Sequence, residues 1–137
     1  MQLTPHFSLH EFTASATARR LGIDNTPQED HIAALRYLCE QLLEPLRNHV
    51  GHPIVINSGF RSPRLNAAVG GVKNSQHLRG EAADIRLDSR RQGEEYIDYI
   101  RQHLKFDQLI LEHTSRGAFW LHVSCRRTGN RQTITRL

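Results

Sequence analysis

Three short segments in the second half of the chain alternate apolar and polar residues, and this pattern constrains the fold most. They are Ala82–Leu87, Asp107–Glu112 and Phe119–Cys125. Successive side chains of a β-strand point to opposite faces of its sheet, so each segment is predicted to be a strand with one apolar and one polar face. Shorter strands are expected at Pro53–Asn57 and Gln132–Arg136. We therefore expect a sheet that buries one of its faces.

Helices are predicted between these strands. Residues Thr26–Glu29 (TPQE) have the pattern of a capping box with Thr26 as the cap, and apolar residues recur after it at helical spacing as far as Gly51. Pro45 is expected to kink or loosen the last turn, because proline has no N–H donor. A second capping box at Ser89–Gln92 (SRRQ) opens another helix. The mixture predicts an α+β class, with a small antiparallel sheet and helices packed on one side.

Size and composition favour one domain covering residues 1–137. A chain of 137 residues has the length of one ordinary domain and can bury a core without disulfides. No apolar run reaches the roughly 20 residues of a membrane span, and the N-terminus lacks the basic and apolar regions of a signal peptide. Cys39 and Cys125 lie in apolar settings and are predicted to be buried free thiols.

Side chains that suit a metal ion gather on the predicted polar faces. Asp84, Glu112 and His122 each lie on the polar face of one strand, and His77 precedes Asp84 in a loop that contains Gly80. Two imidazoles and one carboxylate suit Zn²⁺ and leave a fourth position open, which is typical of a catalytic site. Zinc lowers the pKa of a bound water to about 7 and polarises a carbonyl, which is the chemistry of amide hydrolysis. Glu112 is the best-placed carboxylate to take and return the proton.

Three ordered motifs resemble the signature of the M15 family of zinc peptidases. They are SGFRS at residues 58–62, SQHLRGEAAD at 75–84 and WLH at 120–122. Residues 7–12 (FSLHEF) and 22–27 (GIDNTP) resemble the compact, phage-type branch of the family, so the resemblance covers nearly the whole chain. It implies the small α+β fold shared by D-alanyl-D-alanine carboxypeptidases, phage L-alanyl-D-glutamate endolysins and the zinc domain of hedgehog proteins. It also implies a substrate, the stem peptides of bacterial peptidoglycan.

The resemblance also implies roles for individual residues. By position, His77, Asp84 and His122 match the zinc ligands of the family. Arg61 matches an arginine that binds substrate near the scissile bond, where a guanidinium suits a carbonyl or carboxylate. Ser75 matches a serine whose hydroxyl hydrogen-bonds the carboxyl end of the substrate, with the capping of a local turn as the alternative.

The chain departs from many relatives at one position. They carry the catalytic acid three residues before the last histidine, where this chain has Phe119. Other relatives place it on the preceding strand, so Glu112 is the expected general base if the hairpin register puts it opposite His122. A different register would favour a non-catalytic zinc-binding envelope or virion module of the same fold. Trp120 is predicted to form a wall of the substrate cleft, with a direct role in specificity as the alternative.

We therefore predict a zinc-dependent peptidase that acts on peptidoglycan peptides as a monomer. The net charge of +4 favours anionic surroundings, but the lack of basic stretches interleaved with aromatic residues counts against a nucleic-acid partner. The protein is expected to be made without a signal peptide and to act on the bacterial cell wall. A phage or prophage origin would explain this combination. The sequence leaves the cleaved bond open between D-Ala-D-Ala, L-Ala-D-Glu and a cross-bridge.

Overall fold

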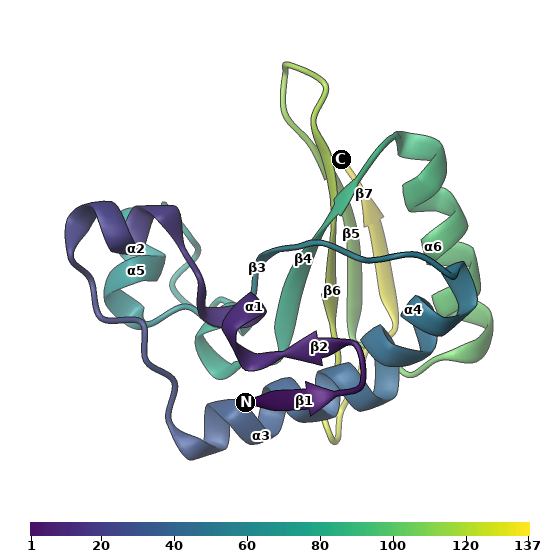
Figure 1. The fold of residues 1–137 in the computed structure, drawn as a ribbon. Coiled ribbons are helices and arrows are strands. Elements are labelled where there is room, and N and C mark those ends of the chain that lie inside the picture. The colour runs from purple at the N-terminus through teal and green to yellow at the C-terminus, as the bar shows by residue number, and fades with distance from the viewer.

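The computed structural model, which describes residues 1–137, is built around a five-stranded sheet (Figure 1). In spatial order its strands are β3 (Ile56–Ser58), β4 (Ala82–Leu87), β6 (Phe119–Ser124), β5 (Gln108–His113) and β7 (Thr133–Arg136). Neighbouring strands are antiparallel except β5 and β7, which run parallel at one edge. A separate hairpin lies at the N-terminus and consists of β1 (Gln2–Thr4) and β2 (Phe7–Ser8). Sheet and helices together confirm the predicted α+β class.

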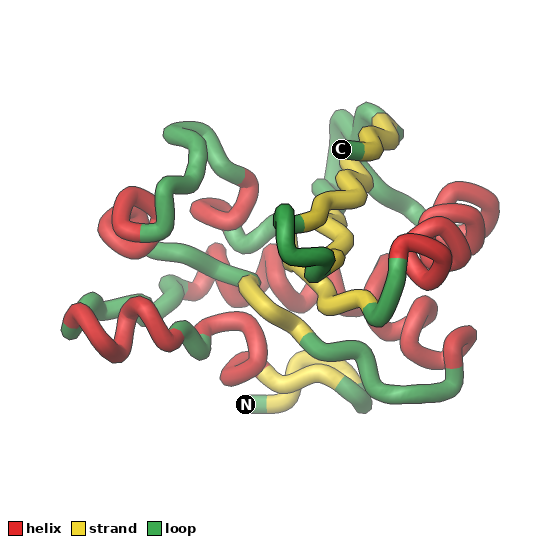
Figure 2. The backbone as a smooth tube through the Cα atoms, turned by 90° about the horizontal axis from the view of Figure 1, so that it is seen from above, coloured by secondary structure: helices red, strands yellow, loops and turns green.

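The predicted alternation is confirmed in β4, β5 and β6. Their inward-facing side chains are completely buried: Ala83, Ile85, Leu109, Leu111, Leu121 and Val123. Helix α6 (Arg90–His103) and the helical segment 29–50 pack against this apolar face and share one core with it. Figures 1 and 2 show α6 running alongside the sheet. The opposite face, which carries the polar residues of the same strands, is therefore left for the functional site.

The long helical segment changes its hydrogen-bond spacing just before Pro45. It consists of α3 (Glu29–Leu38), a π-helical turn (Cys39–Leu43) and α4 (Glu44–Val50). The N–H of Glu44 donates to the carbonyl of Cys39, five residues back. Proline has no N–H and its ring crowds the carbonyl four residues earlier, so a widened turn lets the helix continue past Pro45. The predicted loosening is confirmed, and Gly51 ends the helix in the left-handed conformation, with φ of 74°.

The start of this segment corrects one prediction. Thr26 is expected to cap the helix, but α3 begins at Glu29 with Gln28 as its N-cap residue. The Thr26 hydroxyl and backbone N–H both donate to the Asp24 carboxylate, at 2.6 and 3.0 Å. His31 takes over the capping role, because its Nδ1 accepts from the N–H of Gln28 at 3.0 Å. A competing local acceptor, Asp24, thus removes the hydroxyl that the sequence pattern assigns to the cap.

The remaining helices are short. They are α1 (Leu9–Thr13), α2 (Ala16–Leu21), α5 (Pro63–Ala68) and a 3₁₀ turn (Gln76–Arg79). Figures 1 and 2 show α2 and α5 together at one end of the molecule and α6 at the other. Ser89 caps α6 as predicted, since its Oγ accepts from the backbone N–H of Gln92 at 3.1 Å. None of the helices combines the length and the apolar character needed to cross a membrane.

Both cysteines are buried and unpaired, as predicted. Burial raises the pKa of the Cys125 thiol to about 11, and the nearby Lys105 ammonium only partly opposes this shift. Burial also raises the pKa of Cys39, with the carboxylates around it acting in the same direction. Neither thiol is therefore a nucleophile or a metal ligand near neutral pH.

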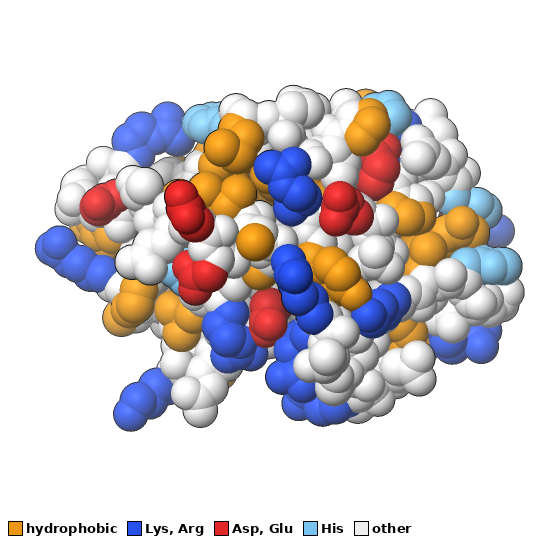
Figure 3. All heavy atoms as spheres, turned by 90° about the horizontal axis from the view of Figure 1, so that it is seen from below, with side chains coloured by type: hydrophobic (Ala, Val, Ile, Leu, Met, Phe, Trp, Pro, Cys, Tyr) orange, Lys and Arg blue, Asp and Glu red, His pale blue; other side chains and the backbone are white.

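Charged side chains of both signs cover the surface. On the face drawn in Figure 3, Lys and Arg side chains gather in the lower middle of the view, and over the rest they are mixed with acidic and apolar groups. Several basic residues are paired, as in the contacts of Arg136 with Glu94 and of Arg101 with Asp98. The positive charge on this face does not form one uninterrupted basic stripe.

Candidate metal centre

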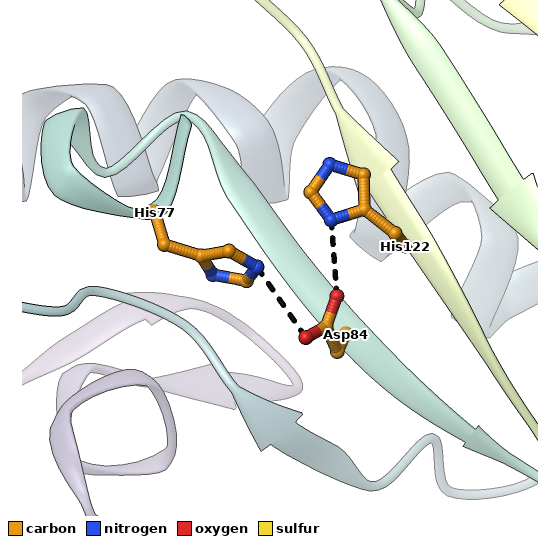
Figure 4. Close-up of side chains that lie close together, drawn as sticks. All are labelled: His77, Asp84 and His122. Carbon is orange, nitrogen blue, oxygen red and sulfur yellow. Dashed lines mark hydrogen bonds and ion pairs between the residues drawn. The ribbon is translucent and has the colours of Figure 1, made fainter. Parts of the chain in front are cut away.

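His77, Asp84 and His122 converge on the polar face of the sheet (Figure 4). Asp84 and His122 are opposite each other because the antiparallel register of β4 and β6 pairs them directly. Nδ1 of His122 lies 3.0 Å from Oδ1 of Asp84, and Nε2 of His77 lies 3.3 Å from Oδ2. Figure 4 shows both imidazole rings directed at this carboxylate, one from the 3₁₀ turn and one from the neighbouring strand. The three side chains therefore meet as the sequence predicts.

The 3₁₀ turn holds His77 in place. Ser75 caps the turn through its Oγ, which accepts from the backbone N–H of His77 at 3.2 Å, and Gly80 ends it with φ of 74°. A Cβ at Gly80 would lie 2.7 Å from the carbonyl oxygen of His31, so glycine is required both by the conformation and by the contact with α3. The turn brings Nδ1 of His77 within 2.6 Å of the Gly59 carbonyl oxygen. Because a carbonyl only accepts, Nδ1 carries a proton and Nε2 is left facing the site.

Asp84 is held in its ionised form. Burial alone would raise the pKa of this carboxyl group, but its contacts with His122 and His77 hold the pKa well below the ordinary value of 3.8. A carboxylate and two imidazoles are ligand types that Zn²⁺ prefers. Ligand atoms about 2.0–2.2 Å from a tetrahedral ion lie roughly 3.3 Å apart, which the two contacts of Asp84 approach. Since all three ligand atoms lie within 4.8 Å of one another, the residues fit a divalent cation.

Glu112 lies on the same face as His122 but is not opposite it. The register of β5 and β6 pairs Glu112 with Trp120, and it pairs His122 with Ile110. The expected pairing of Glu112 with His122 is therefore wrong by two residues, because the hairpin closes on a loop in which the N–H of Thr114 donates to the carbonyl of residue 118. Residues two apart on a strand share a face, so Glu112 still lines the groove that contains His122.

Trp120 contacts Glu112 directly. The indole Nε1–H donates to Oε2 of Glu112 at 3.1 Å, and both side chains line the groove. The indole thus forms a wall of the groove, as predicted, and also orients the carboxylate.

Arg61 follows the turn after β3 and is half-buried. Its Nη2 lies 3.4 Å from Oγ of Ser75, and its buried Nε has no hydrogen-bond partner. Burial lowers the pKa of the guanidinium, whereas the charges of Asp84 and Glu112 oppose this shift. Ser75 takes the turn-capping role described above and also contacts Arg61, whereas its role toward the substrate stays a prediction. The guanidinium keeps donors available for a ligand.

One groove of about 860 Å³ contains every side chain that the sequence singles out. These are Arg61, Ser75, His77, Asp84, Glu112, Trp120 and His122. The volume lies within the roughly 300–1,000 Å³ of ligand sites. Arg79, Arg126 and Arg131 also line the groove. Arg79 and Arg131 are paired with Glu81 and Asp107, so Arg61 and Arg126 are the cationic groups of the lining that suit an anionic ligand.

The residues behind His122 are not among those predicted from the sequence. Nε2 of His122 lies 3.1 Å from Oε1 of Gln76, and Nε2 of Gln76 donates to the buried Asp107 carboxylate at 2.7 Å. The position of Gln76 next to His77 is a signal that could have identified it. Asp107 has no such signal, because its charge partner Arg131 is 24 residues away in the sequence.

Comparisons with known proteins found a peptidase family and a curated relative. The family model described as Peptidase M15 matches residues 5–124. A zinc D-Ala-D-Ala carboxypeptidase of Streptomyces albus G is 45% identical over 95 residues, which is 61% of this chain and 36% of that protein. The chain therefore spans about a third of the length of this curated relative.

Proposed function

The chain belongs to the M15 family of peptidases, and on that premise we propose that it is a zinc-dependent peptidase of bacterial peptidoglycan stem peptides. The observation that carries the proposal is the convergence of His77, Asp84 and His122 in a groove that Glu112 also lines. The name of the Streptomyces albus G relative supports both the metal and the substrate class. Residues 1–137 would form one peptidase domain that acts as a monomer on the cell wall.

Three side chains would hold the metal: His77 through Nε2, Asp84 through its carboxylate and His122 through Nδ1. A bound zinc ion would supply Lewis-acid polarisation of the scissile carbonyl and an acidified water. His77 is already oriented for this role, because the Gly59 carbonyl holds its Nδ1–H at 2.6 Å and leaves Nε2 facing Asp84.

Glu112 would act first as general base and then as general acid. Its carboxylate would take a proton from the attacking water and return it to the leaving amine. Because Trp120 donates to Oε2 at 3.1 Å, Oε1 is the oxygen left to carry the transferred proton. The carboxylate therefore does not need to reorient between the two steps.

Arg61 and Ser75 would position the substrate. The weakly held Nη2 of Arg61 suits an oxygen of a carboxylate or a peptide carbonyl. Stem peptides carry free carboxylates, and Arg61 and Arg126, the lining arginines without an ion pair, complement this charge. Trp120 would form the adjacent wall.

Digestion of purified peptidoglycan tests the proposal. The zinc-loaded protein is incubated with isolated muropeptides, and the products are identified by mass spectrometry. Loss of one terminal D-alanine would identify a carboxypeptidase, whereas release of a longer peptide would identify an endopeptidase and the bond that it cuts. Chelation should abolish the products, and added Zn²⁺ should restore them.

A pair of histidine variants provides the matched control. His77→Ala should remove both zinc binding and hydrolysis, while His113→Ala, at an exposed position next to Glu112, should retain both. The position of Glu112 opposite Trp120 is the observation that favours the second candidate, a zinc-binding module without activity. Zinc binding without any muropeptide product would support that module and reject the peptidase.

A further inference from the structure

A chain of polar contacts runs from His122 into the interior. Nε2 of His122 contacts Oε1 of Gln76 at 3.1 Å, and Nε2 of Gln76 donates to Oδ2 of Asp107 at 2.7 Å. Gln76 is 7% exposed and Asp107 is completely buried. This chain lies on the side of the imidazole ring opposite Asp84, because Asp84 contacts Nδ1.

The charge of Asp107 is neutralised from the C-terminal segment. Oδ1 of Asp107 accepts from the backbone N–H of Arg131 at 2.6 Å and from its Nε at 3.2 Å, and Oδ2 accepts from Nη2 at 2.8 Å. These bonds outweigh the effect of burial and lower the pKa of Asp107 to about 2. The carboxylate is therefore ionised in the folded protein and can only accept hydrogen bonds.

Because the Asp107 carboxylate only accepts hydrogen bonds, it determines which group is the donor in each contact between Asp107 and His122. The amide group of Gln76 must present its NH₂ to the carboxylate, so its oxygen must face His122. That oxygen also only accepts, so Nε2 of His122 must carry a proton. A neutral imidazole has one protonated nitrogen, which leaves Nδ1 as the nitrogen that can bind a metal.

We propose that Gln76 is a positioning residue for the metal centre, with Asp107 fixing the orientation of its amide. Gln76 holds the Nε2–H of His122 and directs Nδ1 at the ion next to Asp84. This inference rests on the proposed function, because it assigns a role toward the zinc ion. The buried Asp107 carboxylate would then have two roles. It pairs with Arg131, and it fixes the orientation of Gln76 and so determines which nitrogen of His122 binds the metal.

Zinc affinity and the Nε2–H resonance of His122 test the inference. Gln76→Leu removes the acceptor, and it is expected to weaken zinc binding by about 10–100-fold, measured by competition with a chelator. In the zinc-loaded protein, the Nε2–H proton of His122 should be protected from exchange in the wild type and should exchange faster in the variant. Gln108→Leu is the matched control, since Gln108 lines the same groove and its side chain makes no hydrogen bond. It should leave both readouts unchanged.

Exchanging the two polar groups provides a second test, which does not depend on Gln76→Leu. Gln76→Glu alone places two carboxylates in contact, and Asp107→Asn alone frees the amide of Gln76 to turn its NH₂ toward His122. Each single variant should therefore bind zinc more weakly than the wild type. The double variant restores the order of donors and acceptors toward His122, because Asn at 107 donates to Glu at 76 and Glu accepts from His122. The contact of Oδ2 with Nη2 of Arg131 is lost equally in Asp107→Asn and in the double variant, so it does not affect their comparison. Recovery of zinc affinity in the double variant would not follow from a purely structural role.

The outcomes separate this inference from the proposed function. Tight zinc binding by Gln76→Leu, or a double variant no tighter than its singles, would overturn the positioning role and leave the peptidase proposal standing. Weakened binding together with rescue would support the role even if the wild type releases no muropeptide. A wild-type protein that does not bind zinc would overturn both. Thermal unfolding of each metal-free variant identifies any that fail to fold. In that case, the exchange rate of the His122 Nε2–H in the zinc-loaded wild type tests the positioning role, and rapid exchange would overturn the contact with Gln76.

Discussion

The indole N–H of Trp120 donates to the carboxylate of Glu112 at 3.1 Å, across a directly opposed pair of the β5–β6 ladder. The contact fixes one oxygen of the carboxylate on the groove side of the sheet. Trp120, two residues before His122 on the same strand, therefore orients the Glu112 carboxylate, which is the group proposed to transfer the proton. The proton-transfer role of Glu112 and the orienting role of Trp120 can be tested with separate variants.

Glu112→Gln keeps the shape of the side chain and removes its ability to accept a proton. We expect the turnover number for muropeptide cleavage to fall by about 10²–10⁴-fold, the usual contribution of a general base. Zinc affinity should be unchanged, because Glu112 is not among the proposed ligands. Activity close to the wild-type level in this variant would require a different base.

Trp120→Phe keeps an aromatic wall and removes the N–H donor. A hydrogen bond to a charged group at a partly exposed site contributes about 1.5 kcal/mol, so the turnover number should fall about tenfold. Combining Trp120→Phe with Glu112→Gln should cost no more than Glu112→Gln alone, since the indole acts through the carboxylate. Fully additive losses would instead indicate that Trp120 contacts the substrate.

Local patterns in the sequence predicted the core of the fold well. The strand Ala82–Leu87 is found with its predicted bounds, because alternation and a flanking glycine define it without reference to the rest of the chain. Asp84 and His122 share a face for the same reason. The start of α3 differs from the prediction because the Thr26 hydroxyl donates to the nearby Asp24 carboxylate and does not accept from the helix N–H groups.

Relationships that depend on pairing between distant segments were not predictable in the same way. The position of Glu112 opposite Trp120 depends on how many residues the 114–118 loop leaves out of the ladder. The contacts of Gln76 and Asp107 depend on three segments meeting in the interior. Alternation assigns a residue to a face of a strand but gives no information on its neighbour across the sheet.

Gly59→Ala tests how closely α1 approaches the metal centre. A Cβ at Gly59 would lie 2.6 Å from Cβ and 2.7 Å from the backbone of Phe12, in a region where Phe60 also donates to the Phe12 carbonyl at 2.7 Å. The backbone must therefore move, at an expected cost of about 1–3 kcal/mol in the free energy of unfolding. The movement also displaces the carbonyl that holds His77, so zinc affinity should fall. Calorimetry and chelator competition measure the two effects.

Gly117→Ala is the control for this variant. A Cβ at Gly117 meets nothing within 4 Å, but φ there is +86°, so alanine is strained by roughly 1–2 kcal/mol. Stability should therefore fall in both variants, whereas zinc affinity should fall only for Gly59→Ala. Equal zinc affinities would show that the Gly59 carbonyl does not orient His77.

Asp107 should make the stability of the metal-free protein depend on pH in the acid range. Its pKa is lowered from 3.8 to about 2 in the folded state, chiefly by hydrogen bonds from Arg131 that outweigh burial. A lowered pKa stabilises the fold above pH 3.8, and this contribution is lost as the pH falls through about 2. This difference in the pKa of Asp107 corresponds to about 2 kcal/mol in the free energy of unfolding, because each pKa unit is worth about 1.4 kcal/mol.

Chemical denaturation at a series of pH values measures this contribution in Asp107→Asn. The variant should be about 2 kcal/mol less stable than the wild type near neutral pH, and the two curves should converge as the pH falls to about 2. Asp88→Asn provides the comparison, because Asp88 is exposed and its carboxylate makes no hydrogen bond. Its curve should follow that of the wild type throughout. A constant difference between Asp107→Asn and the wild type at every pH would show that the lost stability comes from packing and not from the charge that Arg131 neutralises.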